Sequence, residues 1–232
     1  MNEHSASLGT AAAPNSTDEI REFLIRSFRQ SARNEAPYVH WILDDVMPEA
    51  TSRAIVGLPF PAPVIDDTGG KRDTHNSTRI FFSEENQAKY PVCAAVSQAL
   101  QHPDTVAAIK EVTGADLDGS SLRIEYAQDR DGFWLEPHTD IGAKRITFLH
   151  YLIDLPGGET LGTDIYEDDE AHTHFGASPS AFNQAMVFVP AKNTWHGFEN
   201  RTIPGIRRSL IINYVGPEWR NRQELAYPND PV

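Results

Sequence analysis

The chain has 232 residues but only one cysteine, Cys93. A single cysteine excludes an internal disulfide bond and any zinc or iron–sulfur site that needs several cysteine ligands. The sequence also lacks an apolar run long enough to cross a bilayer, and it does not open with the basic and apolar regions of a secretion signal. These absences predict a soluble, cytoplasmic protein that is large enough to be stabilised by its own hydrophobic core.

Basic residues are scarce relative to acidic ones. The 20 lysines and arginines face 33 aspartates and glutamates, which gives a formal net charge of -13. An acidic surface repels phosphate backbones, and no local run of basic residues offsets this charge. The composition therefore argues against nucleic acid as a partner and gives no reason to expect a membrane partner. We therefore expect the partner of this protein to be a small-molecule substrate.

The first half of the chain favours helices. Residues 1–15 are small and polar without periodicity, which predicts a disordered tail. Ser16 and Glu19 form a capping-box pattern that predicts a helix over 17–33. Further helices are expected near 48–57, 90–101 and 104–113.

From Ser120 onward, short strand-like runs alternate with glycine, proline, aspartate and asparagine. No internal repeat or low-complexity linker divides the chain. We therefore expect one domain over 16–232, with helical support over 16–119 and a β core over about 120–216. The predicted class is α+β, mainly β, with an antiparallel jelly roll or barrel and helices packed outside it.

Two polar residues stand out at the end of one predicted strand. His138 and Asp140 are two positions apart, so on a strand both side chains point to one face and can share one metal ion. Taken alone, the pair also fits a surface turn. His196 follows another predicted strand and supplies a third ligand. Two histidines and one carboxylate leave coordination positions open, an arrangement typical of non-haem iron(II) oxygenases.

A third signal lies eleven residues beyond His196. Arg207 and Ser209 share one face of the predicted last strand. An inward-facing arginine is costly unless it meets an anion, and its planar fork fits a carboxylate. Arg208 could take this role if the register shifts by one residue, but Ser209 lies on the face of Arg207 and favours the latter.

The ordered set of these motifs resembles the iron(II)/2-oxoglutarate-dependent dioxygenases, in particular their prolyl-hydroxylase-like branch. The likeness covers roughly residues 120–216 and includes Tyr126, Gly132, His138 with Asp140, Tyr151 with Leu152, Gly157 with Gly158, and Trp195 with His196. The resemblance implies a double-stranded β-helix, a fold shared with cupins. It also implies iron(II) bound by His138, Asp140 and His196.

The same resemblance implies that 2-oxoglutarate and O2 are co-substrates. Arg207 would pair with the distal carboxylate of 2-oxoglutarate, and the candidates for further contacts are Ser209, Tyr126, Tyr151 and Thr147. The implied reaction hydroxylates an unactivated C–H bond and releases succinate and CO2. The carboxylate ligand Asp140 disfavours halogenation, because halogenating relatives leave that position to chloride.

Substrate contacts are the least defined part of the sequence. Asn213 shares the face of Arg207, Trp134 falls on the face of His138, and Arg79 and Arg123 lie before or on strands. By analogy with amino-acid hydroxylases, these residues favour an amino acid or a derivative as substrate. The alternatives are a peptide or protein hydroxylase and a non-catalytic, cupin-like metal-binding protein. A second pair, His172 and His174, has metal-ligand spacing but lies in a segment without a predicted strand.

Overall fold

The computed structural model describes residues 15–64, 69–71 and 79–232. Most of the predicted tail lies outside the described residues. The first half contains the helices, which are α1 (Thr17–Arg29), α2 (Glu49–Val56), α3 (Glu84–Lys89), α4 (Pro91–Gln101) and α5 (Pro103–Thr113). The short strands between these helices are β1 (Ala32–Asn34), β2 (His40–Leu43) and β3 (Ile80–Phe81).

The second half is built of strands joined by loops and two short 3-10 turns. The strands are β4 (Ser121–Asp129), β5 (Leu135–His138), β6 (Lys144–Tyr151), β7 (Asp164–Tyr166), β8 (His174–Ala177), β9 (Ala185–Phe188), β10 (His196–Phe198) and β11 (Arg207–Val215). The turns are η2 (Gly158–Thr160) and η3 (Arg222–Glu224).

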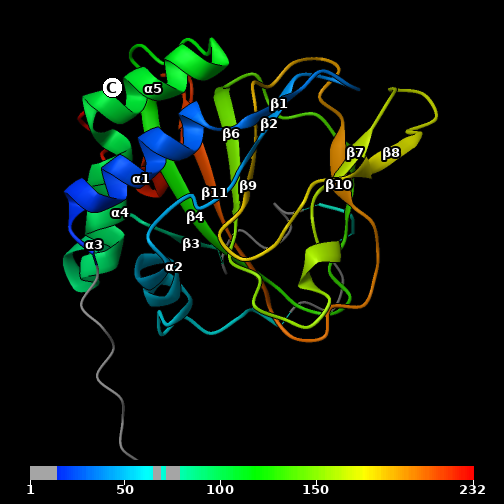
Figure 1. Ribbon diagram of the computed structural model, residues 1–232, viewed down its shortest axis with the longest axis horizontal. Coiled ribbons are helices and arrows are strands. Elements are labelled where there is room, and N and C mark those ends of the chain that lie inside the picture. The colour runs from blue at the N-terminus through cyan, green and yellow to red at the C-terminus, as the bar shows by residue number, and fades with distance from the viewer. Residues whose placement is uncertain (1–14, 65–68, 72–78) are drawn as a thin grey trace, which may run out of the picture.

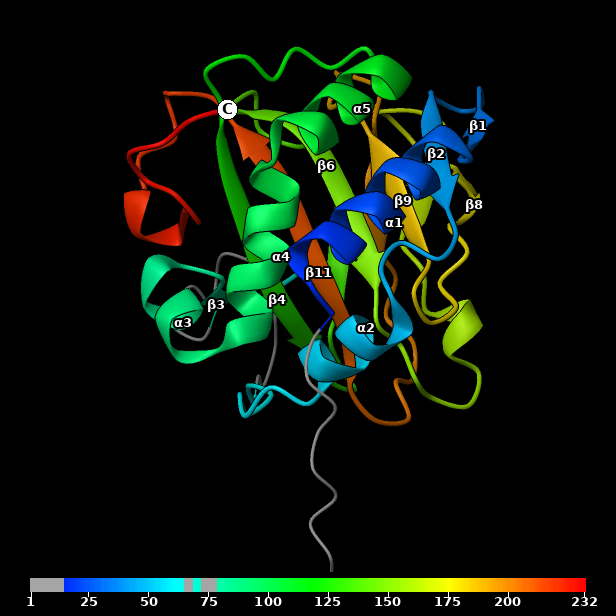
Figure 2. The same ribbon diagram turned by 60° about the vertical axis from the view of Figure 1, so that its left-hand side comes forward.

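These strands form two antiparallel sheets. The larger sheet has the order β1-β2-β9-β6-β11-β4-β3, and the smaller sheet has the order β5-β10-β7-β8. Helices α1, α4 and α5 lie across the outer face of the larger sheet (Figure 2), while β7, β8 and β10 lie on the side away from these helices (Figure 1). The predicted α+β class with helices outside a jelly-roll core is confirmed.

The alternation of side chains along the central strands separates two cores. On β11, Leu210, Ile212 and Tyr214 belong to the core between the larger sheet and the helices. On β6, Phe148 faces the same way and meets Phe28 of α1 edge-to-face at 5.4 Å between ring centroids. The opposite faces of both strands look toward the smaller sheet. Polar residues such as Thr147, Arg207 and Ser209 lie on these inner faces, because side chains alternate between the two faces of a strand.

Most of the predicted helices occur near their expected places. The Ser16–Glu19 capping box is present, and Gly114 ends α5 with a φ of 70°. Helix α1 stops at Arg29, earlier than predicted, because the following residues pair with β2. Helix α3 was not predicted, since none of its residues is buried and it lacks apolar periodicity. None of the helices in the described part of the chain has the length and apolar character to span a membrane.

A buried histidine ties β6 to the N-terminal half. His150 Nε2 lies 3.0 Å from Asn183 Oδ1, and the same amide oxygen accepts from the backbone of Met47 and from the Ser52 hydroxyl. Burial lowers the pKa of His150 to about 4. The imidazole is therefore neutral at neutral pH, and its Nε2 donates to the asparagine.

Protonation of His150 should destabilise the fold in mild acid. The unfolded chain takes up this proton near pH 6.5, whereas the folded chain resists it until about pH 4. The stabilisation is complete above about pH 6.5 and has fallen by about 2 kcal/mol at about pH 5. Urea unfolding at about pH 7.5 and at about pH 5 measures this difference in the free energy of unfolding.

The His150→Gln variant separates this histidine from the others. Glutamine retains an amide donor for Asn183 but takes up no proton, so the variant should lose about 2 kcal/mol of the pH dependence. An equal pH dependence of the two proteins would contradict the assignment to His150.

Candidate metal centre

Two antiparallel strands of the smaller sheet bring the predicted metal ligands together. His138 ends β5, His196 begins β10, and the two residues are direct partners in the ladder between these strands. Asp140 follows β5 two residues later. One potential ligand atom from each of the three side chains lies within 4.8 Å of the others. The spacing in sequence and the strand pairing together produce one cluster of two imidazoles and one carboxylate.

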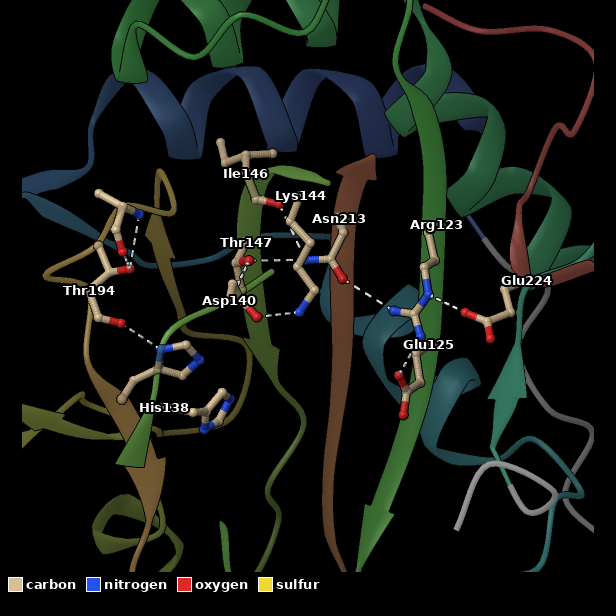
Figure 3. Close-up of polar contacts among 12 residues, drawn as sticks. Arg123, Glu125, His138, Asp140, Lys144, Ile146, Thr147, Thr194, Asn213 and Glu224 are labelled. Atoms are coloured by element: carbon tan, nitrogen blue, oxygen red, sulfur yellow. Dashed lines mark hydrogen bonds and ion pairs between the residues drawn. The ribbon is translucent and has the colours of Figure 1, made fainter. Parts of the chain in front are cut away.

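Backbone carbonyls fix the orientation of both imidazoles. His138 Nδ1 lies 2.8 Å from the carbonyl of Glu136. His196 Nδ1 lies 2.9 Å from the carbonyl of Thr194, the residue labelled in Figure 3. A carbonyl oxygen only accepts, so each Nδ1 carries the hydrogen and each Nε2 is left with a lone pair. Burial lowers the pKa of His196 to about 4, which keeps this ring neutral. Both rings are thus held in the tautomer that a metal ion requires.

The carboxylate of Asp140 is buried and ionised. Thr147 Oγ1 donates to its Oδ2 at 2.5 Å, and Lys144 forms an ion pair with its Oδ1. Burial by itself would raise the pKa of Asp140, but the charge of Lys144 and the hydrogen bonds from Lys144 and Thr147 outweigh it. The pKa is held well below its usual range. Asp140 therefore offers a negative charge to a cation.

The cluster lies in the wall of a cavity of about 410 Å³. The larger sheet supplies the opposite wall through the inner faces of β4, β6 and β11. The residues that line it include the three candidate ligands and Arg79, Arg123, Glu125, Lys144, Thr147, Leu149, Tyr151, Thr163, Phe198, Arg207, Ser209, Ile211 and Trp219. Such a volume is typical of a small-molecule pocket.

Arg207 is held rigidly at the cavity wall near the start of β11. Its Nε donates to the backbone carbonyl of Leu161 at 2.7 Å, and its Nη1 donates to Asp129 at 2.7 Å. The guanidinium lies over the ring of Phe198 at 4.4 Å. Nη2 has no hydrogen-bond partner in the described part of the chain. Because Asp129 takes one side of the fork, an anion in the cavity would meet the remaining edge of the guanidinium.

The hydroxyl of Ser209 lines the cavity beside Arg207, and Ser209 pairs with Tyr151 across the β11–β6 ladder. The hydroxyl of Tyr151 lies 2.8 Å from Thr163 Oγ1 and 2.7 Å from Ser178 Oγ. Arg208 points the other way, and its charge acts on Tyr126 in the helix-side core. The geometry thus separates the two neighbouring arginines onto different faces.

Three of the predicted contact residues do not line the cavity. Tyr126 lies on the opposite face of β4, among the helices, because the inward positions of that strand are the odd-numbered ones. Asn213 is fully buried behind Thr147, with its amide bonded to protein groups. Trp134 packs against Gly70 outside the cavity lining, because it precedes β5, whose ladder with β10 shifts register between Leu135 and His138.

Sequence patterns alone did not reveal several cavity residues. Lys144 sits four positions after Asp140, and Glu125 is two positions from Arg123, so opposite charges at these spacings were the available signal. Thr163 and Trp219 had no signal, since both lie in segments without periodicity.

Tyr38 carries a buried hydroxyl without a partner in the described residues. Burial, and then the neighbouring Tyr151 and Asp140, raise the pKa of Tyr38 well above its usual value.

The histidines His172 and His174 do not form a pair at this site. His174 begins β8, which the sequence did not predict, and its Nε2 lies 3.1 Å from Asp164. Asp164, His174 and Glu199 form a second group of potential metal ligands. However, Asp164 already forms an ion pair with Arg201. The ring of His172 instead packs at a tilt against Trp195, with 4.7 Å between ring centroids.

Neither the protein-family models nor the curated protein sequences contain a match to the chain. Solved structures do resemble it. A prolyl 4-hydroxylase from Phytophthora capsici is 11% identical, with a TM-score of 0.60 over 91% of this chain and 70% of that chain. A prolyl-4-hydroxylase from Pseudomonas putida is 12% identical, with a TM-score of 0.52 over 89% and 99%.

A third similar structure is the non-haem α-ketoglutarate-dependent carbocyclase SnoK from nogalamycin biosynthesis. It is 13% identical, with a TM-score of 0.50 over 95% of this chain and 96% of that chain. At these identities the likeness concerns the fold. The resemblance that the sequence motifs suggested is therefore confirmed at that level, and the chain has the double-stranded β-helix fold of the 2-oxoglutarate/iron(II) oxygenases, with prolyl hydroxylases among its structural neighbours.

Proposed function

We propose that the protein is an iron(II)- and 2-oxoglutarate-dependent oxygenase. In this proposal it hydroxylates an unactivated C–H bond of a small polar metabolite, an amino acid or a derivative, and releases succinate and CO2. The observation that carries the proposal is the convergence of His138, Asp140 and His196 on a cavity that also contains the buried Arg207. The fold supports this reading, because its structural neighbours include enzymes named for this chemistry.

The donor set fits iron(II). Two imidazole lone pairs and one carboxylate form the facial set of non-haem iron(II) sites, which leaves positions for other ligands. The backbone acceptors behind both Nδ1 atoms give these imidazoles the outer support that metal-bound histidines usually have. Bound iron and 2-oxoglutarate would supply the oxidation of the substrate. The protein residues bind and orient both and exclude water.

The Arg207 side of the cavity suits the distal carboxylate of 2-oxoglutarate. Arg207 and Ser209 provide a guanidinium edge and a hydroxyl, and Leu149, Ile211 and Phe198 provide apolar surface for the methylene carbons. A buried arginine without a ligand leaves a donor edge unsatisfied, which favours an anion there. Thr147 has a different role from the expected one, because its hydroxyl hydrogen is given to Asp140.

The charge of the cavity supports a small polar substrate. Among the described residues, five basic side chains and three carboxylates line it, an excess of two positive charges in a protein whose formal net charge is -13. Asp129 and Glu224 lie just behind the lining and pair with Arg207 and Arg123, so they offset this excess. The cavity wall is therefore polar and close to neutral overall, which suits a small polar substrate.

A peptide or protein substrate is the second candidate. One similar structure, 9% identical with a TM-score of 0.53, is a prolyl hydroxylase in complex with a hypoxia inducible factor peptide fragment from Trichoplax adhaerens. A non-catalytic metal-binding protein is disfavoured because a metal store has no use for Arg207 in the same cavity as the ligand cluster.

Loss of a metal ligand should abolish turnover. His138→Ala and Asp140→Ala each remove a donor from the cluster, so neither variant should convert 2-oxoglutarate to succinate, whereas the parent protein should do so in the presence of iron(II) and oxygen. Succinate release measures the difference. Full activity in both variants would refute the proposed metal centre, and circular dichroism checks that both variants are folded.

Arg207 and Arg208 form a matched pair for the co-substrate site. Arg207→Ala should raise the KM for 2-oxoglutarate by about tenfold to a hundredfold, the loss of one or two charge-assisted hydrogen bonds. Arg208→Ala should leave this KM within about threefold, since Arg208 lies on the helix side. An unchanged KM in the first variant with a raised KM in the second would transfer the role to Arg208.

The substrate class can be tested by substrate-stimulated succinate release. We expect free amino acids and small carboxylic acids to raise the rate above the uncoupled background, and mass spectrometry should show a product heavier by one oxygen atom. Proline-containing peptides with blocked termini serve as the comparison. Stimulation by the peptides alone would replace the metabolite proposal with the peptide hydroxylase.

A further inference from the structure

A row of three polar residues crosses the larger sheet beside the candidate metal centre. Thr147 on β6 pairs directly with Asn213 on β11, and Asn213 pairs directly with Arg123 on β4. Their side chains lie on the inner face, and hydrogen bonds join them into a chain that ends on Asp140 (Figure 3). The row therefore connects a candidate metal ligand to residues two strands away.

The hydrogen atoms in this chain have only one consistent arrangement. Arg123 can only donate, so its Nη1, at 3.2 Å, must face the oxygen of the Asn213 amide. The amide nitrogen then donates to the carbonyl of Ile146 at 3.2 Å and to Thr147 Oγ1 at 3.1 Å. Since Thr147 Oγ1 receives this hydrogen, its own hydroxyl hydrogen points to Asp140 Oδ2.

Buried ion pairs fix the far end of the row. Arg123 Nε donates to Glu224 at 2.7 Å, and its Nη2 donates to Glu125 at 2.9 Å. The side chain of Arg123 is 1% exposed. Freeing such a guanidinium from both carboxylates would leave buried charges unpaired, at a high cost in free energy. Arg123 is therefore a stationary donor, and its orientation determines the orientation of the Asn213 amide.

We propose that Thr147, Asn213 and Arg123 are positioning residues of the metal centre. This inference rests on the proposed function, because it assumes that Asp140 binds the metal. The hydrogen bond from Thr147 prevents rotation of the Asp140 carboxylate about its Cβ–Cγ bond, and Asn213 and Arg123 keep the threonine hydroxyl pointing toward it. The carboxylate is thus already oriented when the cation arrives, and no energy is spent on ordering it.

This role differs from the substrate contact expected for Asn213. Asn213 is 0% exposed, and both hydrogens of its amide are already donated to protein acceptors, so it has none to offer to a substrate. Arg123 lines the cavity, but its Nε, Nη1 and Nη2 each already donate to a protein acceptor, namely Glu224, Asn213 and Glu125. Both side chains act on the site through Thr147.

Two substitutions at Thr147 test the row. Thr147→Val keeps the shape but removes the hydroxyl, and it should weaken binding of Co(II) to the purified protein by about 10- to 100-fold, the usual effect of losing an outer hydrogen bond to a metal ligand. It should also change the visible absorption of the Co(II) complex. Thr147→Ser keeps the hydroxyl and should restore both properties to near the parent values.

A third variant alters the direction of the hydrogen bonds. Asn213→Asp keeps the size and the contact with Arg123 but replaces the donor to Thr147 with an acceptor. The threonine hydrogen is then drawn away from Asp140, so Co(II) affinity should fall by about tenfold or more. This variant retains the oxygen that accepts from Arg123, and it keeps the test decisive if Thr147→Val does not fold.

A distant buried threonine provides the matched control. Thr105 in α5 is 0% exposed, and its hydroxyl has no partner within the described residues, so Thr105→Val should not change Co(II) affinity. Isothermal titration calorimetry gives the affinity, and thermal unfolding without metal checks the fold. Parent-like affinity and spectrum in folded Thr147→Val and Asn213→Asp would overturn the positioning role. A parent protein that binds no Co(II) would instead overturn the metal centre itself.

Discussion

The central strand β11 is the element on which the rest of the structure depends. It forms a continuous antiparallel ladder with β4 on one side, and on the other side a ladder with β6 whose register shifts only between Tyr214 and Val215. These ladders fix the register of three strands, and in an antiparallel sheet the register decides which side chains stand next to one another. The apolar residues of β11 lie on the face of the sheet that packs against the helices. Arg207, Ser209 and Asn213 lie on the opposite face, and the backbone hydrogen bonds of the ladders determine which residues stand beside them.

The inner face carries many charges for a protein interior, and almost every one has an opposite partner. Asp140 pairs with Lys144, Arg207 with Asp129, and Arg123 with Glu125 and Glu224. Burying a charge without a partner is costly, whereas a paired group with satisfied hydrogen bonds is tolerated. These pairs explain why a polar cavity can exist beside the apolar residues that pack between the two sheets. They also hold the side chains of the site in fixed orientations before any ligand binds.

The two sheets contribute different parts of the site. The smaller sheet supplies the imidazoles through the direct pairing of β5 with β10, and the larger sheet supplies Arg207 and the row of Thr147, Asn213 and Arg123. The Asp140 side chain joins the two, since it follows β5 and bonds to Thr147 of β6. In the proposed oxygenase, the distance between the sheets therefore sets the space shared by metal, co-substrate and substrate.

The sequence by itself determined the fold class and the three candidate ligands. Strand alternation separates Arg207 from Arg208 whatever the tertiary structure. The same rule suggested one face for His138 and Asp140, although Asp140 lies beyond the end of β5 and reaches the cluster through the segment that follows it. Order along the chain predicted helices first and strands second for the same local reasons. Tyr126 and Trp134 lie outside the cavity lining, because Tyr126 is on the helix-side face of β4 and Trp134 precedes β5.

Only the tertiary structure decided what these residues contact. The register between β11 and its neighbours brought Asn213 to Thr147 and to Arg123, residues 66 and 90 positions away in the chain. No local pattern encodes such a distance, because register follows from the packing of all strands at once. For the same reason the sequence could show a charged Lys144 and a polar Thr147, but it could not show that both hold the carboxylate of Asp140.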